Sequence, residues 1–250
     1  MSVLNERQLA ILNSVISSPK INVAELSEAF SVSQVTIRQD LKLLEKNGML
    51  KRFHGGAMPV SDDDIMKRLS FNYDLKLNIA KKAASLVSNG ETIMIESGST
   101  NALLARELAS KSDVTVITNS SFISRYVRGM NNLKIILIGG DYQHESEVLV
   151  GPLTRICLRE FHVDKVFVGV DGFSPDTGFT CINLMRAEVA RAMADRAEKV
   201  IIVTDSSKFD KVGVACQFKP EEADMVITDK NLTEKHLQVL KGFGIEVITV

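Results

Sequence analysis

The chain has 250 residues, of which 45% are apolar and 24% are charged, and its formal net charge is −1. This balance is typical of an ordinary globular protein and excludes a chain coated in positive charge. No apolar run reaches the roughly 18 residues that cross a bilayer, and the N-terminus lacks the pattern of a secretory signal. We therefore expect a cytoplasmic protein, built as one large domain or as a small module plus a larger domain.

The cysteines argue against a disulfide framework and against a zinc site. Cys157, Cys181 and Cys216 are odd in number and share no short spacing, whereas both kinds of site need paired ligands at short intervals. The sequence predicts three buried free thiols in a reducing compartment. It predicts neither a metal site nor a cofactor.

The first 58 residues predict three helices followed by a β hairpin. Apolar residues between Leu4 and Ile16 recur at helical spacing, and Pro19 is expected to end this first helix. A second helix of two turns is expected over Val23–Phe30, with apolar residues on one face. This succession of short helices is typical of a small DNA-binding module.

A third helix is expected over residues 34–47. Ser33 is suited to cap its N-terminus, and Gly48 is suited to end it. Residues 49–57 then predict two short strands around a wing. Three apolar residues of this helix are expected to face inward, namely Val35, Leu41 and Leu44.

The third helix and the wing carry the residues that are expected to bind DNA. In a helix-turn-helix, a short turn sets the second helix at an angle that fits the ~12 Å wide major groove. Residues 31–58 hold five basic and two acidic side chains, a local net charge of +3. A small helical bundle or a protein–protein module is the alternative. The expected DNA contacts are Ser33, Gln34, Val35, Thr36, Arg38, Gln39, Lys42, Lys51, Arg52 and His54.

This segment resembles the N-terminal signature of the DeoR family of bacterial regulators. The family pattern continues from V-S-x-x-T-I-R-x-D-L through L-E and G to R-x-H-G-G. One departure is Gln39, where the family usually has a second basic residue; the loss of this cation is expected to alter operator affinity or preference. The matching residues are Val32, Ser33, Thr36, Ile37, Arg38, Asp40, Leu41, Leu44, Glu45, Gly48, Arg52, His54, Gly55, Gly56 and Ala57.

A polar, acidic stretch marks the end of the DNA-binding domain. We place that domain at residues 1–58, a linker at 59–70 and a second domain at 71–250, with a helix expected over 65–87. Apolar runs then alternate with helical stretches, which predicts a parallel sheet covered on both faces. The runs are Thr92–Glu96, Val114–Thr118, Lys134–Ile138, Lys165–Val170, Val200–Thr204, Met225–Thr228 and Ile245–Val250.

Small and polar residues follow five of these runs, at the edge where parallel sheets bind ligands. Residues 97–100 precede a helix expected to begin at Asn101, a place suited to phosphate. Asp171, Asp205 and Asn119 are suited to sugar hydroxyls. Arg186 is expected just before a helix that begins at Glu188; either residue could close over a ligand or form an exposed ion pair. The candidate effector contacts are Ser97, Gly98, Ser99, Thr100, Asn119, Ser120, Gly139, Gly140, Asp171, Gly172, Arg186, Glu188, Asp205 and Lys208.

These strand-end motifs are similar to those of the DeoR-type sensor domain, so the resemblance covers essentially the whole chain. It implies a Rossmann-like, mostly parallel sheet domain similar to ribose-5-phosphate isomerase. It also implies a phosphorylated sugar or related metabolite as effector, often with repression relieved on binding. The family often has Asp where Glu96 stands and more often Thr where Ser99 stands, and the longer Glu96 could reshape the sugar end of the site.

Three function classes compete. An active sugar-phosphate isomerase could use Glu188 and Asp171 for proton transfer. Residues 180–186, however, lack the glycine and lysine of the loop that precedes the catalytic glutamate in such isomerases. A metabolite-binding protein without DNA function leaves the first 58 residues unexplained. We therefore expect a repressor rather than an enzyme, acting as a homo-oligomer (a dimer or tetramer) on a double-stranded DNA operator.

Overall fold

The computed structural model describes residues 5–18 and 20–250. Leu4 and Pro19, which the sequence assigns to the start and stop of the first helix, lie outside the described residues. The chain divides into two compact units, with the boundary between Arg68 and Leu69. Each unit has its own hydrophobic core.

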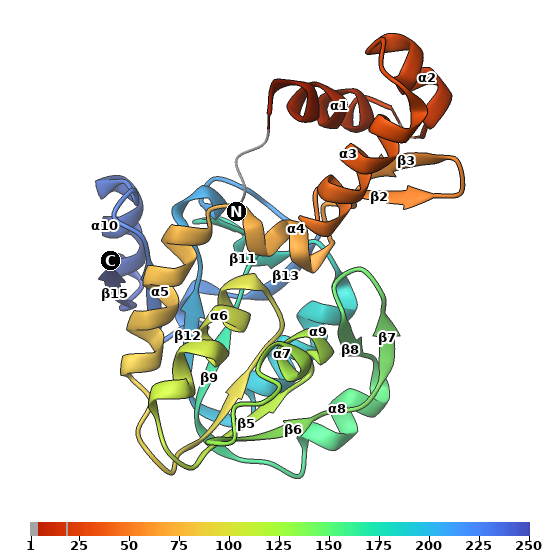
Figure 1. The fold of residues 1–250 in the computed structure, drawn as a ribbon. Coiled ribbons are helices and arrows are strands. Elements are labelled where there is room, and N and C mark those ends of the chain that lie inside the picture. The colour runs from red at the N-terminus through yellow and green to blue at the C-terminus, as the bar shows by residue number, and fades with distance from the viewer. Residues whose placement is uncertain (1–4, 19) are drawn as a thin grey trace. The chain divides into compact units, whose positions relative to one another are not determined.

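The first unit combines three helices with a three-stranded antiparallel sheet of order β1-β3-β2 (Figure 1). The bounds are α1 Glu6–Ile16, β1 Ile21–Asn22, α2 Val23–Ala29, α3 Gln34–Lys46, β2 Leu50–Phe53 and β3 Gly56–Pro59. The three expected helices and the hairpin are thereby confirmed. Their apolar faces form one core of Ile11, Val15, Val23, Leu26, Ile37, Leu41, Leu44, Leu50 and Ala57.

Helix α3 begins and ends where the sequence predicts. The Ser33 hydroxyl accepts a hydrogen bond from the backbone N–H of Thr36, which satisfies one of the unpaired donors of the first turn. At the other end Gly48 adopts φ +71°, a conformation that disfavours a side chain. The Gly48 and Met49 N–H groups then donate to the carbonyls of Glu45 and Leu44, which closes the helix in a Schellman motif.

The expected inward position of Val35 is wrong. Val35 is 60% exposed, whereas Ile37 is fully buried with Leu41 and Leu44. The three buried residues are spaced by four and then three positions, so they share one face of the helix. Val35 lies two residues from Ile37 and therefore points away from the core.

The helix expected over residues 65–87 is two helices, α4 (Ile65–Ser70) and α5 (Tyr73–Ser85). Between them Asn72 adopts the left-handed conformation, with φ 54° and ψ 37°. The apolar period continues across this break, which explains why the sequence predicts a single helix. The segment expected as a linker, 59–70, contains α4 and the last residue of β3.

The second unit is built on a seven-stranded sheet in which every neighbouring pair is parallel. The strand order is β15-β14-β12-β9-β4-β5-β6. The strands are β4 Thr92–Ile95, β5 Val114–Thr118, β6 Leu133–Leu137, β9 Val163–Val168, β12 Ala197–Val203, β14 Met225–Thr228 and β15 Glu246–Thr249. Each of the seven predicted apolar runs is therefore a strand of this sheet, and the α/β fold class is confirmed.

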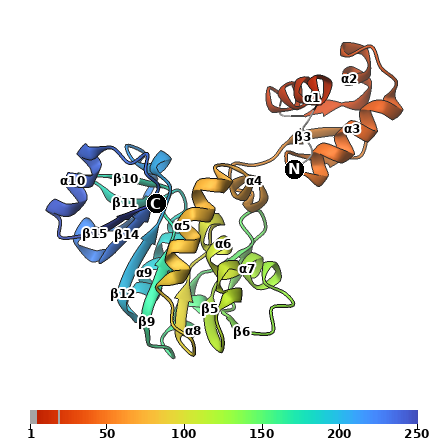
Figure 2. The same cartoon turned by 60° about the vertical axis from the view of Figure 1, so that its left-hand side comes forward.

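Helices cover both faces of the sheet. Helices α5, α6 and α7 lie side by side over one face, and α9 packs on β9 and β12 from the other (Figures 1 and 2). This arrangement follows from right-handed crossovers, because the chain moves along the sheet in opposite directions before and after β9. The helical elements are α6 Ser99–Glu107, η1 Leu108–Ser110, α7 Ser121–Tyr126, α8 Pro152–Leu158, α9 Leu184–Ala194, η2 Ser206–Lys208, η3 Pro220–Glu222 and α10 Glu234–Gly242.

Two small antiparallel sheets were not expected from the sequence. One is the β7–β8 hairpin, and the other has the order β10-β11-β13. Their strands are three or four residues long and carry no extended apolar run, so periodicity does not distinguish them from loops. They are β7 Asp141–Gln143, β8 Val148–Val150, β10 Gly172–Ser174, β11 Gly178–Cys181 and β13 Ala215–Phe218.

The cysteines differ from the prediction of three buried thiols. Cys181 is buried, but Cys157 and Cys216 are exposed. The local sequence does not show which face of a short strand or helix turns to solvent. The predicted burial of Cys157 and Cys216 is therefore wrong. Within the described residues, no helix is long and apolar enough to cross a membrane.

Candidate functional site

The predicted DNA contacts gather on one unit and are accessible. Nine of the ten residues are exposed, and only Thr36 is half-buried. At the start of α3 the hydroxyls of Ser33 and Thr36 lie 2.9 Å apart. One turn further along, Arg38 Nη2 donates to Gln34 Oε1 at 3.2 Å. The guanidinium of Arg38 is therefore held on the exposed face by the residue one turn earlier.

A hollow of about 430 Å³ lies between α3 and the wing, and its lining includes Arg38, Arg52 and His54. Glu45 holds the Arg52 side chain at the edge of this hollow. It accepts a hydrogen bond from Arg52 Nε at 2.7 Å and another from the Arg52 backbone N–H at 2.9 Å. Partial burial raises the pKa of Glu45, but these bonds and the Arg52 charge outweigh it and lower that pKa. Glu45 therefore stays ionised and positions the Arg52 guanidinium.

A buried carboxylate joins α3 to α1. Asp40 is 5% exposed and accepts hydrogen bonds from Arg7 Nε at 2.8 Å and from Gln8 Nε2 at 3.0 Å. The hydrogen bond to Asp40 and the charge of Asp40 raise the pKa of Arg7. The sequence singles out Asp40 only as part of a family match. Its hydrogen bonds hold α3 against α1.

Replacing Asp40 by Ala should destabilise the first unit. Hydrogen bonds to a charged group contribute about 1.5–3 kcal/mol each, and Gln8 would lose its acceptor while remaining buried. We expect a loss of roughly 2–3 kcal/mol, measured by urea unfolding followed in that unit. The control is Asp62→Ala, because Asp62 pairs with Lys67 while its side chain is 96% exposed; it should change stability by under about 1 kcal/mol. Equal losses in the two variants would contradict a structural role for Asp40.

In the second unit, most of the expected effector residues follow strands at the carboxyl edge of the sheet. Because β4 lies between β9 and β5, the loops that follow these strands are neighbours. We call the residues that follow β4, β5, β9 and β12 the strand-end rim. The predicted effector contacts that are buried polar members of the rim are Ser97, Ser99, Thr100, Asn119, Ser120 and Asp205.

The segment after β4 enters α6 earlier than expected, at Ser99 rather than Asn101. Gly98 precedes the helix with φ +127°, and nothing lies within 4 Å of where its Cβ would stand. The first N–H groups of α6 have no partners within the helix. The Asn101 side chain braces this turn by donating to the carbonyls of Glu96 at 2.8 Å and Phe167 at 3.2 Å. The space beside Gly98 is therefore open, while Ser99 and Thr100 at the start of α6 are buried.

Glu96 sits beneath the rim as a structural acceptor. It receives hydrogen bonds from Ser97 Oγ at 2.6 Å and from the Gly169 N–H at 3.3 Å. The Gly169 carbonyl in turn accepts from Gln217 Nε2 at 3.0 Å. Glu96 therefore ties the end of β4 to the end of β9. Gln217 comes from β13, and sequence analysis missed it because no run or motif marks that strand.

Charged groups surround the buried thiol of Cys181. Burial is the main cause that raises its pKa to about 12, and Asp171 and Glu96 raise it further, while a backbone hydrogen bond and the charge of Arg186 lower it. Asp171 Oδ2 accepts from the Ile182 N–H at 3.1 Å. The predicted residues Asp171 and Arg186, together with Glu96, therefore all affect the pKa of this buried thiol.

The end of β12 meets the N-terminus of α5. Asp205 Oδ1 accepts from Asn72 Nδ2 at 3.3 Å and from the Ser207 N–H at 3.1 Å. Nearby in α5, Lys76 is 5% exposed and its Nζ donates to the Phe71 carbonyl at 2.7 Å. Neither Asn72 nor Lys76 was predicted, because both lie before the first strand of the sheet.

Several buried polar atoms near the carboxyl edge of the sheet have no protein hydrogen-bond partner within the described residues. Buried polar groups in folded proteins are otherwise almost always paired, so these atoms are free to bond to a ligand or a water. The set is Asn101 Oδ1, Asn119 Oδ1, Ser207 Oγ, Gln217 Oε1 and Thr228 Oγ1.

Two glycines among the predicted effector contacts, Gly140 and Gly172, have packing roles. A Cβ at Gly140 would collide with Thr154 Oγ1 and the Val150 carbonyl, and one at Gly172 would collide with the Lys211 carbonyl. Both positions are therefore explained by close backbone approach. Gly139 is exposed, and its carbonyl accepts from Thr154 Oγ1 at 2.8 Å.

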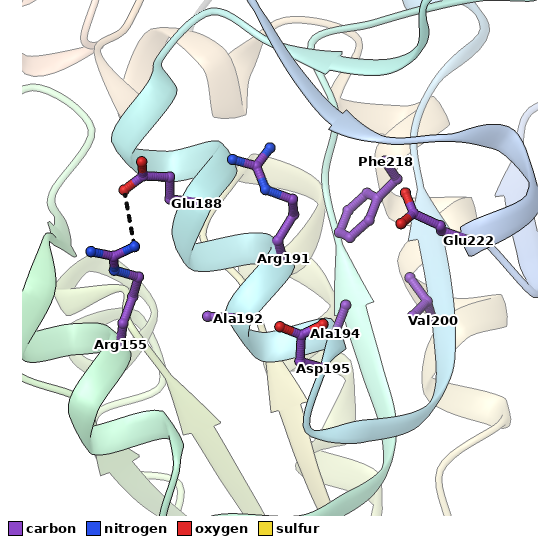
Figure 3. A pocket seen from close by; sticks show the side chains of 9 residues that line it. All are labelled: Arg155, Glu188, Arg191, Ala192, Ala194, Asp195, Val200, Phe218 and Glu222. Carbon is purple, nitrogen blue, oxygen red and sulfur yellow. Dashed lines mark ion pairs between the residues drawn. The ribbon is translucent and has the colours of Figure 1, made fainter.

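The expected helix start at Glu188 is wrong, because Arg186 and Glu188 both lie inside α9. Arg186 is 4% exposed and turns inward. Glu188 instead faces Arg155 of α8, with Oε2 and Nη1 3.6 Å apart (Figure 3). The pair borders a hollow of about 460 Å³ between the outer side of α9 and the start of β12. Glu188 therefore does not join the rim residues.

The two units match two family models. The model described as the DeoR-like helix-turn-helix domain matches residues 7–62, and that described as the DeoR C terminal sensor domain matches residues 71–230. The chain is 33% identical to the HTH-type transcriptional regulator GolR of Listeria innocua serovar 6a, over 97% of both chains. It is 31% identical to the lactose phosphotransferase system repressor of Lactococcus lactis subsp. lactis, over 87% of this chain and 88% of that one.

Among solved structures, ribose 5-phosphate isomerase A from Methanocaldococcus jannaschii matches 55% of each chain, with 24% identity and a TM-score of 0.41. A winged helix-turn-helix unit followed by a parallel α/β unit defines the class of two-domain DNA-binding regulators of transcription. The chain belongs to the DeoR family of transcriptional regulators.

Proposed function

We propose that this chain is a cytoplasmic repressor whose operator binding is controlled by a phosphorylated sugar or a related small anionic metabolite. The observation that carries the proposal is the set of buried polar atoms without a protein partner at the carboxyl edge of the sheet, near the N-terminus of α6, where the space beside Gly98 is open. That edge is where open parallel sheets bind ligands. A relative named as the repressor of a lactose phosphotransferase system supports a link to sugars.

Each end of such a ligand has matching chemistry on the rim. The N–H groups at the start of α6, with the hydroxyls of Ser99 and Thr100, suit the phosphate. Lys208 in η2 is the expected cation on the β12 side. Asn119, Asp171 and Asp205 suit the hydroxyl groups of a polyol, because their amide and carboxylate oxygens accept hydrogen bonds.

The accessible surface of α3 suits the major groove, and Lys51, Arg52 and His54 on the wing suit the flanking phosphates. A second copy of the chain, joined through the α/β units in a dimer or tetramer, would pair two such surfaces on a repeated operator. In this scheme the ligand acts by favouring one of two states that differ in DNA affinity.

An isomerase remains the competing function, and the position of Glu188 disfavours it. A general base must lie within hydrogen-bond reach of the proton that it removes. Glu188 instead pairs with Arg155, away from the rim. Glu188 therefore does not supply the second carboxylate that proton transfer with Asp171 would need.

The decisive experiment screens pentose and hexose phosphates, with inorganic phosphate as a reference, by thermal shift of the full chain. We expect at least one sugar phosphate to raise the melting temperature and to change affinity for a duplex from the chain's own upstream region. A bound ligand at 100 times its Kd adds about 2.7 kcal/mol of stability. A turnover assay on the same panel is the second arm. Isomerisation that disappears in Glu188→Gln would overturn the regulator interpretation of this site.

A further inference from the structure

The strand-end rim is tied to the point where the chain enters the second unit. Asn72 is the residue between α4 and α5, and its side-chain amide bonds to Asp205, which lies 133 residues later. This hydrogen bond therefore connects the carboxyl edge of the sheet to the two-residue connection between α4 and α5, which we call the joint. We call Phe71, Asn72, Lys76 and Asp205 the Asn72 tether.

Asn72 occupies an unusual position for this task. It stands at the N-cap of α5, yet its side chain makes no capping bond to the helix and bonds to Asp205 instead. Its backbone is left-handed, with φ 54°. Such a conformation is disfavoured for residues other than glycine, although Asn tolerates it better than most.

Lys76 holds the other side of the joint. The chain leaves α4 at Ser70, and Phe71 is 60% exposed. The Phe71 carbonyl nevertheless accepts from the buried Lys76 ammonium at 2.7 Å, and its ring lies 5.8 Å from that ammonium. Two side-chain contacts, one from α5 and one from the rim, therefore fix two consecutive residues that belong to no helix.

From these contacts we infer that Asn72 couples the effector site to the DNA-binding unit, an inference that rests on the proposed function. Asp205 Oδ1 already accepts hydrogen bonds from Asn72 and Ser207, so a ligand hydroxyl that donates to this same oxygen competes with the Asn72 amide. The bond that it displaces is long, at 3.3 Å, and therefore weak. Once this bond is lost, Asn72 leaves its left-handed backbone conformation, and the connection between α4 and α5 changes its conformation.

The covalent chain carries this change to DNA. Residues 65–70 form α4, which follows the wing strand β3 after a short turn. A rearrangement at Asn72 therefore acts on the segment that leads directly into the DNA-binding unit. The contact differs between the ligand-bound and ligand-free states, which is what coupling between two sites requires.

The test compares Asn72→Ala and Asn72→Gly with wild type in fluorescence anisotropy on the upstream duplex. Both variants remove the amide, and Gly keeps the left-handed backbone accessible, so agreement between them isolates the side-chain bond. Asn78→Ala is the matched control, because Asn78 is an exposed Asn on the same helix. Circular dichroism establishes that each variant is folded.

We expect both Asn72 variants, without ligand, to take the DNA affinity of ligand-bound wild type, a shift of at least about fivefold, with Asn78→Ala unchanged. Adding the sugar phosphate that gave the largest thermal shift should then alter DNA affinity by less than about twofold. That sugar phosphate should still bind, and at least as tightly as to wild type, because its competitor for Asp205 is gone.

The outcomes separate the two proposals. If the ligand-free DNA affinity of both Asn72 variants equals that of Asn78→Ala, the tether does not couple the sites, whatever the ligand does. If no sugar phosphate binds wild type while the Asn72 variants still shift DNA affinity, the effector class is wrong and the tether stands. Thermal shift with inorganic phosphate then shows whether the rim accepts the anion alone.

Discussion

Arg38→Ala should abolish specific operator binding and leave ligand binding intact. Arg38 is exposed on α3 and is held there by Gln34, so its guanidinium is oriented before DNA arrives. A bidentate contact with guanine contributes about 1–3 kcal/mol of discrimination. Two copies on a paired operator would double this to about 2–6 kcal/mol, a loss of roughly 30- to 20,000-fold in specific affinity. Anisotropy with specific and scrambled duplexes measures the ratio.

Two further variants sharpen the Arg38 result. Arg38→Lys keeps the charge but loses the planar fork, so it should also lose specificity while retaining salt-dependent binding. Lys46→Ala removes an exposed cation from the last turn of the same helix, outside the predicted contacts. It should change the salt dependence slightly and the sequence preference not at all. Specific affinity that survives in Arg38→Ala would show that α3 does not read the operator in this orientation.

Ser99→Asp should have the second large effect, a loss of effector binding with DNA binding unchanged. Ser99 is the first residue of α6 and is 5% exposed. A carboxylate there is compatible with the helix, because negative charge near an N-terminus is stabilising. It would nevertheless repel an incoming phosphate by about 4 kcal/mol at 4 Å and an effective dielectric constant of 20. We expect ligand affinity to fall by about three orders of magnitude, measured by calorimetry.

Ser99→Asn is the matched control for this prediction. Asn has the size of Asp without its charge, so the Asn variant reports the steric part alone and should retain measurable ligand binding. DNA affinity without ligand should be the same in both variants and wild type. If Ser99→Asp binds and responds to the sugar phosphate as wild type does, the phosphate position at α6 is misassigned.

The two predictions rest on different kinds of evidence. For α3 the sequence carries most of the argument, because an exposed polar face follows directly from helical spacing once the core positions are known. For the rim, the chain order of the motifs identifies the loops, but their buried and unpartnered atoms appear only in three dimensions. Glu188 illustrates the difference: its place at the start of an expected helix made it a candidate, and its pairing with Arg155 appears only in the structure.

The sequence by itself determined the local features of this protein. Apolar runs located all seven strands of the parallel sheet, and the Ser33 cap and the Gly48 stop located α3, because short-range sterics and hydrogen bonds act within a few residues. Only the tertiary structure decided which distant residues meet. The bonds from Asn72 to Asp205 and from Gln217 to Gly169 join segments 133 and 48 residues apart. Such contacts depend on sheet order and crossover geometry, which no local pattern encodes.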